Sequence, residues 1–303
     1  MKTLYISDLD GTLLNSSAEV SEHTKNALNA MLADGLEFSV ASARTLASAS
    51  IILAGLNLKL PVVLMNGVLI YDMARREYTR INKLPPETVA AVIETLRSHS
   101  LTGFMYELYN GEQRTYHESL EQEPLRNFVE ERISRYYKTF RHTEGFSEVS
   151  PENIIYFTLL DTHARLSAVH EALLLVPGLS LTFYRDTYSD DLWYLEMFSD
   201  AASKKNAVEF LRREYGYERV VCFGDNLNDL PMFEASDVCI ASGNAQPEVR
   251  AAADFVCGDC DEDGVVRWLE VNLLHKLTSV NPQSKLTSVK SQRKLTSGGT
   301  SCE

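Results

Sequence analysis

The first eighty residues alternate between short apolar runs and patterns typical of amphipathic helices. Apolar runs at Leu4–Ile6, Glu37–Ala41 and Val62–Met65 are typical of buried strands. Between them, the pattern predicts a helix capped by Ser21 and ended by Gly35, and a second helix from about Leu46 to Leu56. Because strand and helix alternate in this order, we expect parallel strands joined by right-handed crossovers.

The pattern changes near Lys83-Leu84-Pro85-Pro86. Helical stretches follow at 87–99, 125–137 and 164–175, with strand-like runs between and after them: "TGFMYEL", "QRTYHE", "NIIYFTLL", "LSLTFYR" and "LWYLEMF". This order is typical of an α+β insertion with antiparallel strands. The parallel pattern resumes at about Ser203 and continues through the strand Val220–Phe223 and the run "VCIA" to closing helices that end near Leu274.

The chain is therefore predicted to have an α/β fold with two domains. Residues 1–83 and 190–274 would form a Rossmann-like core with a doubly wound parallel sheet, and residues 84–189 an inserted α+β domain. Residues 275–303 repeat the tetrapeptide "KLTS" and lack aromatic side chains. Such a segment cannot bury enough apolar surface to order itself, so we expect a disordered tail. The alternative for this tail is a role in binding a membrane surface or a partner.

Composition and charge exclude several classes of protein. The 303 residues are 45% hydrophobic and 23% charged, as in ordinary globular proteins, and the formal net charge is -13. A nucleic-acid-binding surface needs clustered Lys and Arg, which this charge balance argues against. No apolar run approaches the roughly 18 residues of a membrane span, and the first acid comes before any signal-peptide core. We expect no membrane or nucleic-acid partner and a cytoplasmic location.

The cysteines give no sign of a disulfide framework. There are five, which fits a reducing compartment, and only Cys257 and Cys260 form a CxxC pair. A zinc site would need a second pair or histidines at ligand spacing, and the seven histidines are scattered along the chain. Packing or surface roles are therefore favoured for these residues.

Two acids end the first predicted strand. In "SDLDGTLLN", Asp8 and Asp10 are two positions apart, so a strand would point both to one face. Two like charges at this distance repel, unless a cation lies between them or one acid is protonated. Both arrangements are typical of active sites. The same sequence is also compatible with a strand that ends in an acidic turn, with Gly11 providing the backbone freedom.

A second acidic cluster follows another buried-type strand. "VVCFGDNLND" breaks at Gly224 into a stretch that contains Asp225, Asn228 and Asp229. If this strand lies beside the first, Asp225 and Asp229 face the first acid pair across one crevice. Carboxylate oxygens gathered in this way suit Mg2+.

Two further residues suggest a site for a phosphate group. Ser42, in "VASAR", would place a hydroxyl at a strand end next to a helix N-terminus, where anions are stabilised. Lys204, in "DAASKKN", could neutralise a phosphoryl oxygen. Alone, either residue is more often a helix cap or a solvated charge, but in this order they compose one site with the acids.

These motifs, taken in order, resemble those of the haloacid dehalogenase superfamily of phosphohydrolases. The resemblance covers roughly residues 1–272 and is to the Cof-like branch, whose type IIB cap domain is inserted between the second and third motifs. It implies that Asp8 is the nucleophile that forms an aspartyl-phosphate, and that Asp10 protonates the leaving oxygen and then activates water. It also implies that Ser42 and Lys204 grip the phosphoryl oxygens.

The resemblance further implies a Mg2+ ion. Its ligands would be the Asp8 carboxylate, the Asp10 backbone carbonyl and Asp225, with Asp229 supporting them and Asn228 near the phosphate.

Two motifs depart from the family pattern. Ala41-Ser42-Ala43-Arg44 stands where Ala-Thr-Gly-Arg is usual. Ser42 keeps the hydroxyl of the usual Thr, whereas Ala43 has less backbone freedom than the usual Gly. Arg44 is a further candidate for phosphate binding. Lys205 replaces the usual Gly after Lys204, and we expect it to point away from the site. In "LMNGVLIYD", Asn66 and Gly67 are candidates to line the substrate entrance, while a simple turn is the alternative for Asn66.

The function predicted from these residues is a Mg2+-dependent phosphatase for small phosphorylated metabolites, above all sugar phosphates. Asp10 supports hydrolysis or phosphoryl transfer, because the family's ATPases carry Thr there and its dehalogenases lack the acid. A phosphosugar mutase of the same superfamily and a phospho-ligand sensor without turnover are the alternatives.

The cap would choose the substrate, and its closure is expected to exclude water. Its candidate specificity residues are Tyr106, Glu107, Arg185 and Asp186, which cannot be distinguished from ordinary strand-face residues.

Overall fold

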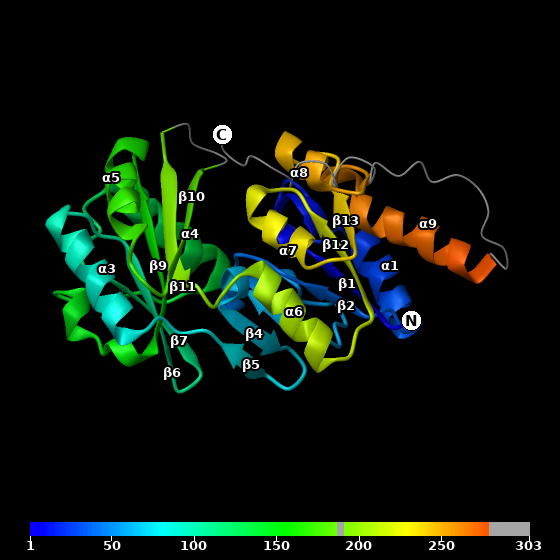
Figure 1. Cartoon of the computed structure of the whole chain (residues 1–303), viewed down its shortest axis with the longest axis horizontal. Helices are drawn as coiled ribbons and strands as arrows, with labels where there is room; N and C mark the ends of the chain where they lie inside the picture. The colour runs from blue at the N-terminus through cyan, green and yellow to red at the C-terminus, as the bar shows by residue number, and fades with distance from the viewer. Residues whose placement is uncertain (187–190, 279–303) are drawn as a thin grey trace, which may run out of the picture.

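The computed structural model describes residues 1–186 and 191–278, which form two domains lying side by side (Figure 1). The core domain is built on a five-stranded sheet in the order β14-β13-β12-β1-β2, in which every pair is parallel. Its strands are β1 (Thr3–Ser7), β2 (Phe38–Val40), β12 (Arg219–Gly224), β13 (Val238–Ala241) and β14 (Phe255–Val256).

Helices cover both faces of the core sheet. Leu4 and Ile6 of β1 pack in one buried cluster with Val208, whereas Tyr5 packs on the other face in a cluster with Leu28. Both faces are apolar because successive side chains of a strand point in opposite directions. The predicted doubly wound α/β core is confirmed. The core helices are α1 (Glu22–Ala33), α2 (Leu46–Ile52), α6 (Lys204–Glu214), α7 (Leu230–Glu234), α8 (Pro247–Ala252) and α9 (Gly264–Thr278).

A small antiparallel sheet lies beside the core sheet. It consists of β3 (Val62–Leu64), β4 (Leu69–Asp72) and β5 (Glu77–Ile81), and it meets the core through a single parallel bridge between Ala41 and Val63. The strand expected at 62–65 therefore exists, but its main partner is antiparallel. The reason is the turn that follows it, where positive φ angles at Asn66 and Gly67 reverse the chain.

The cap domain contains a six-stranded sheet in the order β10-β11-β9-β6-β7-β8. All its strand pairs are antiparallel except β7 with β8. This confirms the predicted insertion of α+β type. The strands are β6 (Phe104–Tyr109), β7 (Glu112–His117), β8 (Arg141–His142), β9 (Ile154–Asp161), β10 (Leu179–Arg185) and β11 (Trp193–Ser199), and the helices are α3 (Pro86–Ser98), α4 (Glu123–Tyr136) and α5 (His163–Leu173).

The two faces of the cap sheet have different neighbours. Helices α3 and α5 cover the outer face and lie far from the core domain (Figure 1), in a buried cluster that includes Leu195 and Met197 of β11. The inner face packs against α4, where Phe104 stacks on Phe128 at 4.5 Å between ring centroids. Tyr156 of this inner face shares one buried cluster with Met65 of the core domain. The inner face therefore looks toward the core.

One predicted domain boundary is wrong. A boundary at residue 190 assigns β11 to the core, but β11 pairs with β9 and β10 in the cap sheet. This pairing agrees with the run "LWYLEMF" being part of the insertion. The chain returns to the core only after Ser199, in a turn closed by a hydrogen bond from the Ala202 amide to the Ser199 carbonyl.

The end of the described chain differs slightly from expectation. Helix α9 continues to Thr278, so residues 275–278 of the predicted tail belong to a helix. The predicted disorder of the remaining tail falls on residues 279–303, outside the described residues. Within the described part of the chain, no helix is long and apolar enough to cross a membrane.

Candidate active site

The two acidic clusters meet at one edge of the core sheet. Ser7 pairs with Phe223, and the Asp8 amide donates to the Phe223 carbonyl at 2.9 Å, so β1 and β12 end side by side. Carboxylate oxygens of Asp8, Asp225 and Asp229 all lie within 4.8 Å of one another. The arrangement expected for these three acids is present because parallel strands deliver their carboxyl ends to the same edge.

Lys204 is buried among these acids. Its ammonium nitrogen lies 2.6 Å from Asp8 Oδ1 and 2.6 Å from Asp229 Oδ1, and its side chain is 1% exposed. Burial opposes the charge, but the two carboxylates outweigh burial and raise the pKa of Lys204, which stays protonated. One ammonium group therefore balances one of the three carboxylates.

The remaining negative charge fits a divalent cation. Burial, reinforced by the charge of Asp229, raises the pKa of Asp225 to about 7. Burial also raises the pKa of Asp8, against the influence of Lys204. Such shifts show that the acids resist ionisation together, and an oxygen-bound Mg2+ would remove this repulsion. The donor set is one that Mg2+ accepts.

Asp229 has both oxygens engaged by the protein. Oδ1 contacts Lys204, and Oδ2 accepts hydrogen bonds from the backbone amides of Asp225 and Asn226 at 2.9 and 3.1 Å. Gly224 is required beside it, because a Cβ there would lie 2.6 Å from the Asp229 Cβ. Asp229 thus holds the loop and the lysine, which supports an indirect role at a metal site.

Asp225 is fixed by the loop that follows β1. The Thr12 hydroxyl donates to Asp225 Oδ1 at 2.9 Å. Gly11 has a φ of +71°, and a Cβ on it would lie 2.3 Å from Asp225 Oδ2. The Gly-Thr pair after the first acids therefore allows this approach and supplies a hydrogen bond. The sequence analysis quoted this pair without assigning a role to Thr12.

Asp10 is not part of the group of three acids and is paired with an arginine instead. Its carboxylate forms a bidentate pair with Arg44, with Nε to Oδ2 at 2.8 Å and Nη2 to Oδ1 at 2.5 Å. Arg44 also donates to Ser48 and to the Tyr136 hydroxyl of α4, at 2.8 and 2.9 Å. Burial disfavours its charge, yet the bonds to Asp10 and Tyr136 raise the pKa of Arg44. In this structure Arg44 joins Asp10 to the cap.

The other predicted phosphate ligands lie around the same edge. Ser42 is buried, its hydroxyl accepts from the Arg44 amide at 3.1 Å, and its carbonyl accepts from the Asn66 amide at 3.0 Å. The Asn228 side chain donates to Asn66 Oδ1 at 3.4 Å. Lys205 points away, as predicted, and pairs with Glu234 at 3.0 Å.

Of the cap residues proposed from the sequence, two have side-chain contacts within the cap. Tyr106 is buried under Lys138, whose ammonium lies 4.4 Å from the ring centroid. Glu107 accepts from Tyr116 at 2.9 Å and pairs with Arg114. Arg185 and Asp186 follow one another at the end of β10, where the Asp186 amide donates to the Leu192 carbonyl.

Two other cap residues, Tyr156 and Glu196, contact the core domain and were not predicted from the sequence. Asn66 Nδ2 donates to the Tyr156 hydroxyl at 3.3 Å and to Glu196 Oε2 at 3.4 Å. Nothing in the local sequence marks these residues, because their role depends on the packing of two domains.

The CxxC pair does not form a zinc site of its own. Among described residues, Asp259, Cys260 and Asp261 could approach one ion, but Cys257 is not part of that group. Asp261 accepts from the Ser16 amide at 2.7 Å and Asp259 from the Asp261 amide, so these acids brace the loop before α9.

Comparisons with known proteins agree with this geometry. The family model of haloacid dehalogenase-like hydrolases matches residues 5–269. The "Putative phosphatase YxeH" of Bacillus subtilis is 30% identical over 284 residues, covering 91% of this chain and all of that protein. "Phosphatase YwpJ" of the same organism is 27% identical over 299 residues, covering 89% and 99%.

A solved structure is similar as well. A haloacid dehalogenase-like hydrolase from Bacteroides thetaiotaomicron superposes with a TM-score of 0.74 and 25% identity, over 90% of this chain and 100% of that one. The chain belongs to the haloacid dehalogenase-like hydrolases, in their Cof-like branch, and the resemblance stated from the motifs is confirmed. It is a phosphatase.

Proposed function

We propose that the protein is a Mg2+-dependent phosphatase that hydrolyses small phosphorylated metabolites, above all sugar phosphates, through an aspartyl-phosphate on Asp8. The observation that carries the proposal is the position of Asp8. It is 5% exposed, follows the interior strand β1, and lies against the Lys204 ammonium and two further acids. A carboxylate oriented by a charged group in a buried setting is a suitable nucleophile.

The reaction divides into two displacements. An oxygen of Asp8 forms a bond to phosphorus while the ester oxygen leaves, and Asp10 gives a proton to that oxygen. Water then attacks phosphorus and breaks its bond to Asp8, with Asp10 as the base that takes the water proton. Because Asp10 is paired with Arg44 in this structure, the pair must open before Asp10 can act on the leaving group.

The phosphoryl oxygens would be held by groups already at this edge. Lys204 supplies a fixed positive charge, and Ser42 and Asn228 supply hydroxyl and amide hydrogen bonds. Arg44 becomes available for phosphate only when it leaves Asp10. Asn66 contacts Asn228, which supports a role for Asn66 beside the rest of the substrate.

The carboxylates of Asp8 and Asp225 and the backbone carbonyl of Asp10 would hold Mg2+. When bound, this ion would neutralise charge on the phosphoryl group. Asp229 keeps Asp225 and Lys204 in place, since both of its oxygens are already used.

Phosphate release tests the proposal. The purified protein is incubated with sugar phosphates, nucleotides, pyridoxal phosphate and flavin mononucleotide, with Mg2+ or with EDTA. Asp8→Asn should abolish release, and the exposed control Asp34→Asn should leave it unchanged. We expect release only with Mg2+, fastest for a sugar phosphate. Binding of these compounds without release would favour a sensor, and activity that requires a bisphosphate activator would favour a mutase.

A further inference from the structure

Glu196 is a buried acid on the inner face of the cap sheet. It lies on β11 between Leu195 and Met197, which point to the outer face, and it is 8% exposed. Since side chains alternate along a strand, Glu196 points toward the core domain. A carboxyl group is seldom buried without a function or a partner.

Polar side chains connect Glu196 to the acidic cluster. Asn66 donates to Glu196 at 3.4 Å, and Asn228 donates to Asn66 at 3.4 Å. Asn228 immediately precedes Asp229, which contacts Lys204. Glu196 is therefore two side chains away from the loop that carries the acids, on the side occupied by the cap.

The side-chain amides of Asn66 and Asn228 are not fully used in hydrogen bonds. The bonds made by Asn66 Nδ2 are 3.3 and 3.4 Å long, at the outer limit for such bonds. Asn228 Oδ1 is buried and has no hydrogen-bond partner within the described part of the chain. A buried acceptor of this kind calls for a donor. One hydroxyl of a ligand could donate to Asn228 Oδ1, and a neighbouring hydroxyl of the same ligand could donate to Glu196.

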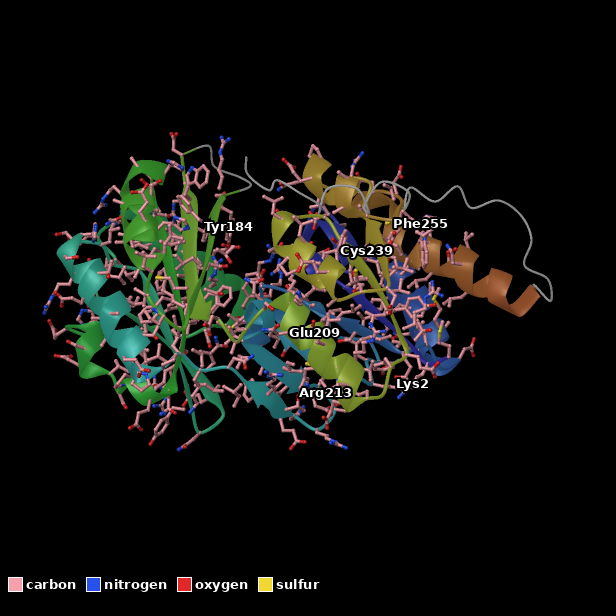
Figure 2. All side chains as sticks on the ribbon, viewed as in Figure 1. Lys2, Tyr184, Glu209, Arg213, Cys239 and Phe255 are labelled. Atoms are coloured by element: carbon pink, nitrogen blue, oxygen red, sulfur yellow. The ribbon has the colours of Figure 1, made fainter. Side chains whose placement is uncertain are left out.

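The surroundings of Glu196 favour a neutral, hydroxyl-bearing ligand. The phenol groups of Tyr156 and Tyr184 are within hydrogen-bonding reach of its carboxyl, and burial raises the pKa of Glu196 to about 7. Tyr184, labelled on β10 in Figure 2, is partly exposed and stacks on Tyr194 at 5.3 Å. Carboxyl, amide and phenol groups beside aromatic faces suit the hydroxyls and C–H edges of a polyol.

We infer that Glu196 determines specificity, by accepting a hydrogen bond from a hydroxyl of the leaving alcohol beside Asn66 and Asn228. The substrate is then a phosphate ester of a sugar or another polyol. This inference rests on the proposed phosphatase function and adds the residue that recognises the alcohol.

The test compares the hydrolysis of the preferred sugar phosphate with that of an aryl phosphate in variants of Glu196 and Tyr184 and in a control variant. Phosphate release is measured for a panel of hexose and pentose phosphates and for p-nitrophenyl phosphate, whose leaving group has no aliphatic hydroxyl. Glu196→Gln should lower kcat/KM for the preferred sugar phosphate by about 10- to 100-fold, mainly through KM, and leave the aryl ester within about twofold. Tyr184→Phe, at a partly exposed position, should cause a smaller loss with the same selectivity.

The matched control is Glu107→Gln. Glu107 is another buried glutamate of the cap sheet, and it contacts Tyr116 and Arg114 of the cap. It should not change the ratio between the two esters. If Glu196→Gln and Tyr184→Phe lower both esters equally, or neither, Glu196 has a structural role and the inference is wrong. If the wild-type protein releases phosphate from no ester at all, the proposed function itself fails.

Discussion

Replacing Asp225 with Asn should stabilise the metal-free protein at alkaline pH. Asp225 is held near Asp8 and Asp229, and burial with the charge of Asp229 raises its pKa from 3.8 to about 7. A raised pKa means that the folded state binds the proton more tightly than the unfolded state. The resulting stabilisation is complete below about pH 4 and is lost as the pH rises to about 7. Above pH 7 the ionised carboxylate therefore weakens the fold.

The size of the effect follows from this shift. Roughly three pH units at about 1.4 kcal/mol each give an upper bound of about 4 kcal/mol. Coupling to the neighbouring acids spreads the shift over several groups, so about 2 kcal/mol is expected for one residue. Asn removes the charge and keeps an oxygen that can accept from Thr12. For a chain of this length, the gain corresponds to an increase in Tm of about 3 °C.

Thermal denaturation in EDTA at pH 8 and pH 5 measures this gain, with and without added Mg2+. Asp225→Asn should have the higher Tm at pH 8, and the difference should shrink at pH 5, where the folded wild type holds the proton. Mg2+ should raise the Tm of the wild type at pH 8 and not that of the variant. The exposed control Asp34→Asn should follow the wild type. A variant less stable than the wild type in EDTA at pH 8 would refute the repulsion assigned to these acids.

Two further substitutions test the charge balance and the loop. Lys204→Met leaves buried carboxylates without a counter-charge and should lower the free energy of unfolding, measured by chemical denaturation, by about 3–5 kcal/mol. The control Lys205→Met, at an exposed ion pair, should lower it by less than about 1 kcal/mol. Equal losses in the two variants would contradict the role of Lys204. Gly11→Ala places a Cβ 2.3 Å from the Asp225 carboxylate and should weaken Mg2+ binding in calorimetric titration. Gly35→Ala also has a positive φ but nothing within 4 Å, so it should lose stability without losing Mg2+ affinity; a similar loss of affinity in both would count against the Gly11 argument.

The acid cluster could be predicted because its cause is local and topological. Asp8 and Asp225 each follow an apolar strand, and alternating helices made those strands parallel, which places their ends together. Lys204 is the first residue of α6, and its place in the site could be predicted from the order of the motifs along the chain. The strand at 62–64 was predicted but not its antiparallel partner, because its pairing depends on the positive φ angles of Asn66 and Gly67.

Contacts between the domains could not be predicted in the same way. Glu196 and Tyr156 are ordinary strand residues until the cap packs on the core and places them against Asn66. The bond from Arg44 to Tyr136 likewise joins residues more than ninety positions apart. The boundary at residue 190 was wrong for a related reason, since the pairing of β11 with β9 and β10 joins segments that are separated along the chain. Hydrophobic periodicity shows which residues are buried and not which surfaces meet.

The most direct test of the account is to look for the phosphoryl group on Asp8. The wild-type protein is mixed with Mg2+ and its preferred ester, quenched in acid within one turnover, and digested for peptide mass mapping. We predict a mass gain of one phosphoryl group on the peptide that contains Asp8, absent from Asp8→Asn and absent without substrate. Rapid phosphate release with no phosphorylated peptide, or with the group on another residue, would contradict the assignment of Asp8 as the nucleophile.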